Sequence, residues 1–500
     1  MKKMICAAAF LTVLWLIGAG SATATSTLCV AQATPGCFAT IQAAVDAASN
    51  GDTIRVAAGT YAGGITITKS VQLVGASAGA TIVKGGGPVV TIGRFEGDNG
   101  GLQVAISRMT ITGGVEDTPG NAGGGGISIP QSRGQATGAT VRIDDSVISD
   151  NQAAPSSTFS TDNPGPCNGV PQQECAFASG GGIGNAGNLA LTRTLVVGNV
   201  AGSPGITHYA FGGGISNGPQ GILSLNWSVV SGNRAAVSPP DGRFSEGGGI
   251  KDFGTMTIAF SQITGNSSVV VSSVPSSILG NHVEQNADAG GVDLSSRGTA
   301  TVDGSTISGN TVSDFDSNGD AQAFNGGIDD DGTLVLTASI VDRNTVSAGV
   351  PDGSGFVAAA NSGGVGLTGT ASVQFSHIGG NSLEANSANG LAFAGGAGVG
   401  DFSGHLSVDR SLITGNSGSA TSGADTIALG GGILETSFGG PEPQVTITDT
   451  VVVANRLTGT AGTPEGGGIF NGGLGGGGPY PLTVARSVIQ GNSPDQCVGC

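Results

Sequence analysis

The chain has 500 residues, 93 of them glycine, with no break in composition, which favours one elongated domain over several globular ones. Asp and Glu (35) outnumber Lys and Arg (18), so the net charge at pH 7 is −17. The scattered basic residues exclude a nucleic-acid-binding face. The negative charge repels an anionic polymer such as pectate on average, although a local pocket can override this repulsion.

The first 24 residues have the pattern of a secretory signal peptide. Two lysines precede an apolar stretch at residues 7–17, and residues 22–24 (Ala-Thr-Ala) form a typical cleavage site. This pattern predicts an exported protein, either secreted or at the cell surface. No second apolar run reaches the roughly 18 residues that a membrane-spanning helix needs, so no membrane span is expected.

Cleavage after residue 24 leaves six cysteines, which fall into three close pairs. The pairs are Cys29 with Cys37, Cys167 with Cys175, and Cys497 with Cys500. An even number of paired cysteines in an exported chain predicts disulfides. The alternative for the last pair is a redox-active Cys-x-x-Cys motif, but no thioredoxin-like pattern surrounds it.

A short amphipathic helix is predicted near the N-terminus. Ile41, Ala44, Val45 and Ala48 follow helical spacing, and Asn, Gly and Asp at residues 50–52 end the pattern. Residues 53–56 then begin a strand.

From about residue 65 the chain repeats one frame roughly ten times, and residues 212–233 are its clearest copy. Each copy has a glycine run followed by Ile or Val, a second short apolar piece, and a third piece of the form Ser/Thr-x-(Ile/Val)-x-x-Asn. Short β-branched pieces bounded by Gly, Asn and Ser indicate strands joined by turns. Self-similarity at this period indicates a solenoid, and the glycine content disfavours a helical one.

Three strands per copy fit one coil of a parallel β-helix, in which equivalent residues of successive coils lie about 4.8 Å apart. The Ile and Val columns then form the core, and the closing asparagines can stack their amides. The asparagines expected in this ladder are Asn199, Asn233, Asn266, Asn310, Asn344, Asn381, Asn416 and Asn455. Extra length falls mostly between the Asn and the next glycine run, which predicts long loops on one face, where repeat proteins usually bind ligands.

The glycine and asparagine frame resembles the right-handed parallel β-helix (pectin-lyase-like) superfamily, over roughly residues 38–495. Its repeats are similar to those of polymorphic outer membrane proteins, with Ile or Val often in place of Phe. The resemblance implies an all-β chain with a helical N-terminal cap at residues 25–64, a β-helix at 65–495 and a Cys-containing tail at 496–500. The superfamily includes lyases, glycosidases, adhesins and proteins without known activity, so the fold alone does not define a function.

One acidic segment has the spacing of a calcium-binding loop. Alternate oxygen ligands and a Gly turn wrap a hard cation in such loops. The predicted ligands are Asp314, Asp316, Asn318, Asp320 and, in place of the usual Glu, Asn325. Calcium there would stiffen the segment, and the alternative is a solvated acidic loop.

Acidic residues also recur two positions after the Ile/Val of the glycine frame. On neighbouring coils Asp401 and Glu435 would lie about 5 Å apart, as in retaining glycosidases. Two coils separate Asp252 from Asp330, about 9.5 Å, which suits an inverting pair. The alternative is that Asp and Asn favour this corner for its turn geometry.

The sequence motifs of β-helix lyases and galacturonases are absent, and Trp227 with three Tyr offers few rings for sugar stacking. The first expectation is therefore a non-catalytic, adhesin-like surface or secreted protein that binds a polysaccharide or a cell-surface ligand through its loops. The alternative is a polysaccharide lyase or glycoside hydrolase. A groove in which three or more acidic, basic and cationic side chains converge would favour the enzyme.

Overall fold

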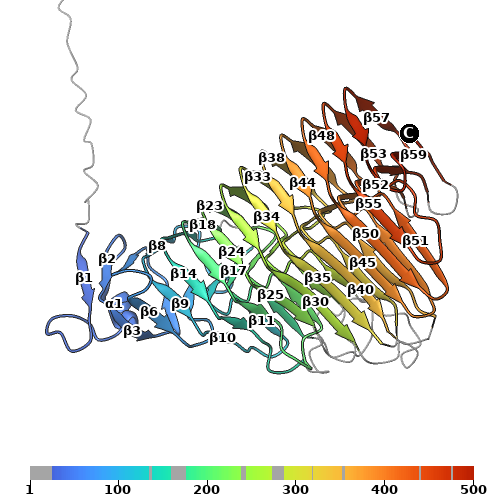
Figure 1. The fold of residues 1–500 in the computed structure, drawn as a ribbon. Coiled ribbons are helices and arrows are strands. Elements are labelled where there is room, and N and C mark those ends of the chain that lie inside the picture. The colour runs from blue at the N-terminus through green and yellow to red at the C-terminus, as the bar shows by residue number, and fades with distance from the viewer. Residues whose placement is uncertain are drawn as a thin grey trace, which may run out of the picture.

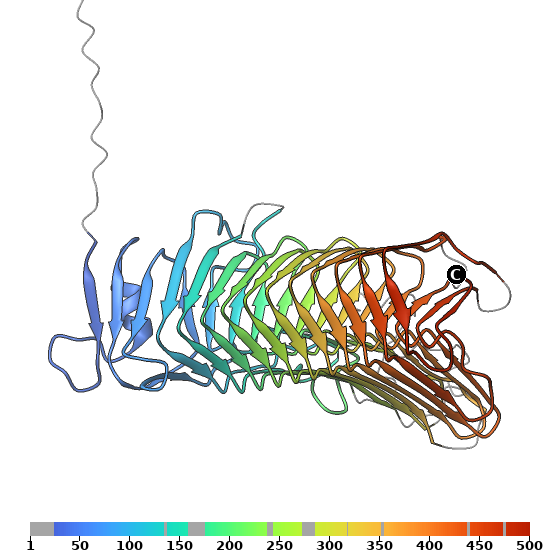
Figure 2. The same cartoon turned by 45° about the horizontal axis from the view of Figure 1, so that its top comes forward.

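The computed structural model describes residues 25–134, 138–158, 176–237, 244–272, 286–317, 319–351, 355–437, 441–473 and 477–500. These residues form a long parallel solenoid with one short helix, which confirms the predicted fold class (Figure 1). A full turn visits five sheets before it returns to the first. Three sheets close a tube, and two form a flat extension that we call the wing (Figure 2).

Sheet A, on the first face of the tube, contains β1 (Thr27–Val30), β2 (Thr53–Val56), β5 (Gln72–Gly75), β8 (Gln103–Ser107), β13 (Thr140–Asp144), β18 (Asn188–Thr192), β23 (Ile222–Asn226), β28 (Thr255–Ala259), β33 (Thr299–Asp303), β38 (Thr333–Thr337), β43 (Thr370–Gln374), β48 (His405–Asp409), β53 (Gln444–Thr448) and β57 (Leu482–Ala485). Sheet B contains β3 (Gly59–Ala62), β6 (Thr81–Lys84), β9 (Thr110–Thr112), β14 (Val147–Ser149), β19 (Leu195–Val197), β24 (Val229–Ser231), β29 (Gln262–Thr264), β34 (Thr306–Ser308), β39 (Ile340–Asp342), β44 (His377–Gly379), β49 (Leu412–Thr414), β54 (Val451–Val453) and β58 (Val488–Gln490). Sheet C contains β4 (Ile65–Ile67), β7 (Val90–Ile92), β12 (Ile127–Ile129), β17 (Ile183–Asn185), β22 (Ile215–Asn217), β27 (Ile250–Asp252), β32 (Val292–Leu294), β37 (Ile328–Asp330), β42 (Val365–Leu367), β47 (Val399–Asp401), β52 (Ile433–Glu435), β56 (Ile469–Asn471) and β59 (Cys497–Val498).

The wing lies between sheets B and C in chain order. Its sheet D contains β10 (Val115–Glu116), β15 (Gln152–Ala153), β20 (Val200–Ala201), β25 (Arg234–Val237), β30 (Ser267–Ser272), β35 (Thr311–Asp316), β40 (Thr345–Val350), β45 (Ser382–Ser387), β50 (Ser417–Ser422) and β55 (Arg456–Gly459). Its sheet E contains β11 (Asn121–Gly123), β16 (Phe177–Ser179), β21 (Tyr209–Phe211), β26 (Phe244–Glu246), β31 (Asn286–Asp288), β36 (Ala321–Phe324), β41 (Ala358–Asn361), β46 (Leu391–Gly395) and β51 (Asp425–Leu429).

The wing corrects the expectation of three strands and long loops in each coil. Segments between the closing Asn and the next glycines form paired strands, which pack as two sheets around a core of small residues, mainly Ala and Val. Strands of sheet D lengthen from two residues in β20 to six in β35. Alanine side chains on the facing sides allow the two sheets to approach closely. The facing sides of the wing strands therefore mostly lack the large apolar residues by which strands are usually predicted from a sequence.

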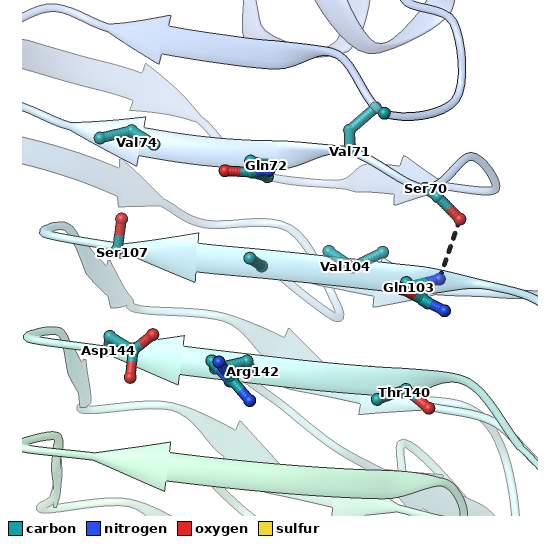
Figure 3. A pocket seen from close by; sticks show the side chains of 12 residues that line it. Ser70, Val71, Gln72, Val74, Gln103, Val104, Ser107, Thr140, Arg142 and Asp144 are labelled. Atoms are coloured by element: carbon teal, nitrogen blue, oxygen red, sulfur yellow. Dashed lines mark hydrogen bonds between the residues drawn. The ribbon is translucent and has the colours of Figure 1, made fainter. Parts of the chain in front are cut away.

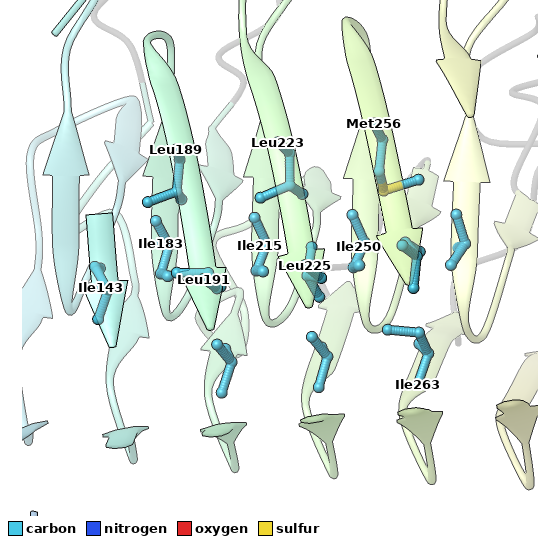
Figure 4. Packing of buried hydrophobic residues seen from close by; sticks show 14 of the residues in the cluster. Ile143, Ile183, Leu189, Leu191, Ile215, Leu223, Leu225, Ile250, Met256 and Ile263 are labelled. Atoms are coloured by element: carbon cyan, nitrogen blue, oxygen red, sulfur yellow. The ribbon is translucent and has the colours of Figure 1, made fainter. Parts of the chain in front are cut away.

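The core of the tube consists of aliphatic columns, as the repeats predict. Leu189, Leu223 and Met256 are register partners in successive turns, and their side chains point inward (Figure 4). All three are almost completely buried. Each such side chain contributes about 1.5–3 kcal/mol to folding.

A buried ladder of asparagines marks the corner at which the chain leaves sheet B for sheet D. Each amide Nδ2 donates to the Oδ1 of the next turn's Asn at 2.9–3.0 Å, from Asn151 through to Asn492. The backbone N–H of each Asn donates to the same Oδ1. These bonds satisfy polar groups inside the protein, where an unpaired group is costly.

The N-terminal end is covered by α1 (Ile41–Ala47), whose Thr40 cap accepts a hydrogen bond from the Ala43 N–H at 3.2 Å. Its apolar face, including Ile41 and Val45, is buried in the core of the tube. Disulfides join Cys29 to Cys37 and Cys497 to Cys500. The predicted signal peptide (1–24), Cys167 and Cys175 lie outside the described residues. None of the helical segments in the described residues has the length and apolar character of a membrane-spanning helix.

Candidate functional site

The four acidic residues proposed from the corner position lie inside the tube. Asp252, Asp330, Asp401 and Glu435 end strands of sheet C and are fully buried, in the column that elsewhere holds Leu294. The Gly332 N–H donates to Asp330 Oδ1 at 3.0 Å, and the Gly404 N–H donates to Asp401 Oδ1 at 2.7 Å. Such contacts are those expected if Asp occupies this corner for its turn geometry rather than for catalysis.

Burial raises the pKa of all four carboxyl groups, because the charged form loses its hydration. The pKa reaches about 6 for Asp252, about 7 for Asp330 and Asp401, and about 8 for Glu435, to which the neighbouring Asp401 also contributes. These groups affect stability, since their side chains face the core rather than the surface.

The predicted calcium ligands lie on strand β35 and in the segment that follows it. Asp314 and Asp316 lie on β35 and face the interior of the wing, where Asp314 Oδ2 accepts a hydrogen bond from the Gln322 N–H at 2.7 Å. Asp320 Oδ1 accepts one from the Val357 N–H, and Asn325 lies at the junction with sheet C. Asn318 lies outside the described residues. Among the residues that the structure describes, no group of three His, Cys, Asp or Glu side chains is arranged to hold a metal ion.

A different cluster of charged residues lies where sheets C and E meet at an angle, and we call this junction the cleft. Sheet C contributes Lys251, Asp293 and Asp329, which are register partners in three successive turns. Sheet E contributes Glu246 and Asp288, partners in two of these turns. The cleft contains a cavity of about 230 Å³. The cavity is lined by Asp288, Phe324, Asn325, Asp329, Asp331, Asn361, Leu367, Thr368 and Phe402.

The ammonium of Lys251 is held at one end of the cleft. Its Nζ lies 2.7 Å from Glu246 Oε2 and 2.6 Å from Asp293 Oδ1, and 4.9 Å from the centre of the Phe253 ring. Burial alone lowers the pKa of Lys251, but the carboxylates of Asp293 and Glu246 outweigh burial and hold the pKa above its usual range. Lys251 therefore remains protonated.

Two carboxyl groups share one amide donor in the next part of the cleft. Asn325 Nδ2 donates to Asp329 Oδ1 at 2.7 Å and to Asp288 Oδ1 at 3.0 Å. Two hydrogen bonds to one nitrogen keep these oxygens within roughly 6 Å of each other. Burial, followed by the proximity of other carboxylates, raises the pKa of Asp288 and of Asp329 well above the usual range. Burial likewise raises the pKa of Asp293, to about 7.

The backbone is strained beside the cleft. The corner between sheets E and C has a positive φ in ten successive turns, and seven of them use glycine: Gly124, Gly180, Gly212, Gly247, Gly396, Gly430 and Gly466. The exceptions are Ala289 (φ 44°), Asn325 (φ 61°) and Ser362 (φ 55°), in three consecutive turns at the cleft. Non-glycine residues in this conformation cost of order 1–3 kcal/mol and concentrate at functional sites.

Glycines on sheet C make room for the side chains of Asn325 and Ser362 beside the cavity. The column that holds Asp329 continues with Gly366 and Gly400. A Cβ at Gly366 would overlap Asn325 Oδ1, and one at Gly400 would meet Ser362 Oγ. Asn325 Oδ1 and Ser362 Oγ are buried without a hydrogen-bond partner, as is Asn361 Oδ1.

Aromatic rings flank the cleft at both ends. Phe211 packs edge-on against Phe253 beside Lys251, with ring centres 6.1 Å apart, while Phe324 and Phe402 line the cavity. A sugar-binding groove commonly presents such faces. The count of Trp and Tyr in the sequence missed them because they are all Phe.

Sequence reasoning missed the cleft, apart from naming Asn325 for another role. Two signals mark it. A charged residue follows the Ile/Val of the glycine frame in three consecutive copies, at Lys251, Asp293 and Asp329. The first glycine of the frame is also replaced in three consecutive copies, by Ala289, Asn325 and Ser362.

A larger cavity, of about 530 Å³, lies on the outer face of sheet A at strands β5, β8 and β13 (Figure 3). Gln72, Gln103 and Arg142 are among its lining residues, and the Gln103 N–H donates to Ser70 Oγ at 3.0 Å. Its charged side chains, Arg142 and Asp144, come from one strand. It therefore lacks the convergent acidic groups of the cleft.

Comparison with protein-family models and with curated protein sequences gives no match. Solved structures with a similar fold include the A-module of mannuronan C-5 epimerase AlgE4 from Azotobacter vinelandii, at 14% identity over 92% of this chain and 94% of that one, with a TM-score of 0.34. They also include a mannuronic acid-specific polysaccharide family 6 lyase from human gut microbiota, at 10% identity over 85% and 87%, with a TM-score of 0.30.

These comparisons correct the first functional expectation. Each of these structures is named as an enzyme, a mannuronan C-5 epimerase or a polysaccharide lyase, and none as an adhesin, so the non-catalytic, adhesin-like expectation is not maintained. At this identity the likeness concerns the fold, and the chemistry is argued from the cleft.

Proposed function

We propose that the chain is an exported enzyme that cleaves a polysaccharide by hydrolysis in the cleft. The observation that carries the proposal is the convergence there of a lysine ammonium and at least four carboxyl groups: Glu246, Lys251, Asp288, Asp293 and Asp329. A groove in which three or more charged side chains converge is the feature expected of an enzyme rather than of a binding protein. Asp288 and Asp329 line an open cavity and can meet a ligand.

Glycoside hydrolysis requires one protonated and one ionised carboxyl group on either side of the bond. Asp329 is the proton donor in our proposal, because it lines the cavity and burial raises its pKa, which favours the protonated form. Asp331 is exposed at the same cavity, and its Oδ1 accepts a hydrogen bond from the Thr368 hydroxyl at 2.6 Å. We assign Asp331 as the carboxylate that activates water or attacks the sugar.

The same residues favour hydrolysis over β-elimination. Elimination needs a free base, whereas both carboxylates around Lys251 keep its ammonium protonated. Lys251 instead supplies a fixed positive charge that positions Glu246 and Asp293.

The test is turnover on a panel of neutral, cationic and anionic polysaccharides, with reducing ends and ultraviolet absorbance of unsaturated products measured together. We expect reducing ends without absorbance. Asp329→Asn should lower kcat by about 10²–10⁴, the usual contribution of a general acid. Asp303→Asn, at the surface of sheet A, is the control. Absorbance that grows with turnover would replace hydrolysis by elimination, and absence of turnover on the whole panel would refute the enzyme.

We also propose that the protein is exported and that it binds calcium. The signal-like pattern of residues 1–24 supports export, and the repeat frame supports kinship with polymorphic outer membrane protein repeats. Calcium at Asp314, Asp316, Asn318, Asp320 and Asn325 rests on the spacing of the ligands. If it binds, calcium should raise the thermal unfolding midpoint of the wild-type chain but not that of the Asp314→Ala/Asp316→Ala variant. Equal shifts in both would remove this site.

A further inference from the structure

Lys251 shows how the cleft holds an ammonium group. Its Nζ contacts carboxylates from both walls, Glu246 of sheet E and Asp293 of sheet C, and lies near the Phe253 ring. Only 6% of the residue is exposed. An alkylammonium ion with acidic partners and an aromatic face is thus already part of this surface.

The following turns offer similar partners without the cation. Asp288 takes the register position of Glu246, and Asp329 takes that of Asp293. Rings of Phe324 and Phe402 line the cavity beside them. No Lys or Arg is among the described residues that line this cavity.

Two buried acceptor atoms at the cavity independently indicate a missing donor. Asn325 Oδ1 and Asn361 Oδ1 have no hydrogen-bond partner, although these residues are only 7% and 4% exposed. Both residues line the cavity. A buried polar atom without a partner is costly, so a ligand that brings N–H donors gains by meeting them. Hydroxyl groups alone would leave an ionised Asp288 without a counter-charge.

We propose that the cavity binds a primary ammonium group of an amino-sugar polymer, against the carboxyl group of Asp288 and within reach of Asn361 Oδ1. This assignment names the substrate class and rests on the proposed polysaccharide function. The net charge of −17 attracts such a polycation and repels a polyuronate. A divalent metal ion is the competing ligand, yet no group of three His, Cys, Asp or Glu side chains in the described residues is arranged to hold one.

Binding to glucosamine oligomers, and to the same oligomers after N-acetylation, tests the proposal by titration calorimetry on the full chain. Charged hydrogen bonds predict about 10-fold to 100-fold tighter binding of the free amines. Asp288→Asn should remove most of this preference, whereas the surface control Asp303→Asn should retain it. Asn361→Lys brings an ammonium from the chain itself, and we expect it to abolish amine binding while the protein stays folded.

The binding and cleavage measurements together distinguish a failure of the amine site from a failure of the proposed enzyme. Amine binding that depends on Asp288 without any cleavage would refute the enzyme but leave the amine site intact. Cleavage of a polymer with equal affinity for amine and acetylated oligomers would refute the amine site alone. Calcium or magnesium that binds in an Asp288-dependent manner, with no preference for amines, would also overturn it.

Discussion

Ser362 and Asn325 place polar side chains beside the cavity at a corner that is otherwise structural. Both occupy a corner at which most turns use glycine, with φ of 55° and 61°. Their side chains carry unpartnered oxygens next to the cavity. At this corner, only the turns that form the cleft have non-glycine residues with a positive φ, although such residues also recur at the corner between sheets A and B along the solenoid.

Ser362→Gly should stabilise the protein by about 0.5–1 kcal/mol, because glycine adopts a positive φ without strain and the buried hydroxyl is removed. The same substitution at Ser347, within strand β40, should destabilise by a similar amount, since glycine weakens a strand. Urea unfolding of both variants is the measurement. A loss of stability at Ser362 equal to that at Ser347 would contradict the strain argument.

Individual side chains of the cleft could not be predicted from the repeat frame. Lys251, Asp293 and Asp329 occupy an outward position that in most solenoids is simply solvated. Their environment depends on sheet E, which covers one side and which the sequence does not announce. Asp252 and its equivalents were singled out instead because they recur, yet that position faces the core.

The asparagine ladder is the element that joins tube and wing. Each amide donates to one neighbour and accepts from the other, so an interior Asn serves two adjacent turns. At the C-terminal end the series closes on Gln496, whose Oε1 accepts from Asn492 Nδ2 at 3.2 Å.

Asn344→Ala should cost about 2–4 kcal/mol, because the buried backbone N–H of Asn310 loses its acceptor and the Ile307 carbonyl loses a donor. Asn492→Ala, at the end of the ladder, should cost less, since only one adjacent turn loses its bond. Chemical denaturation of both variants compares the two positions. Equal losses of stability would contradict the claim that an interior asparagine stabilises two adjacent turns and the last one only one.

The strands of the tube were predictable, whereas those of the wing were not. Tube strands contain β-branched residues at fixed offsets from Gly and Asn, so ten copies reinforce one another. Wing strands such as β45 (Ser382–Ser387) and β46 (Leu391–Gly395) are built from small residues and vary in length. Composition therefore suggested loops, and only long-range pairing with neighbouring turns makes these segments strands.

Stability of the whole molecule should depend on pH through its buried carboxyl groups. Asp252, Asp330, Asp401 and Glu435 have pKa values of about 6 to 8, above their unfolded values of 3.8 to 4.5. Between about pH 4 and pH 8 the folded state binds more protons than the unfolded state. The free energy of unfolding must then fall as pH rises through this range.

The thermal unfolding midpoint should consequently be higher at pH 5 than at pH 8. Glu435→Gln, which cannot ionise, should reduce the difference. Differential scanning fluorimetry at both pH values suffices, with Asp303→Asn as the matched surface variant. A midpoint that rises from pH 5 to pH 8 would show that these carboxyl groups are not buried as described.

The turn-by-turn register has a consequence for how such a gene can change. Asn381 and Asn416 are equivalent positions 35 residues apart in adjacent turns. A segment between two such positions can be duplicated or deleted, because the turns on either side still have strands in matching register to pair with. Recombination can therefore alter the length of the rod outside the cleft. The stretch that carries Lys251, Asp293 and Asp329 has no such freedom, because inserting one repeat would separate groups that must touch.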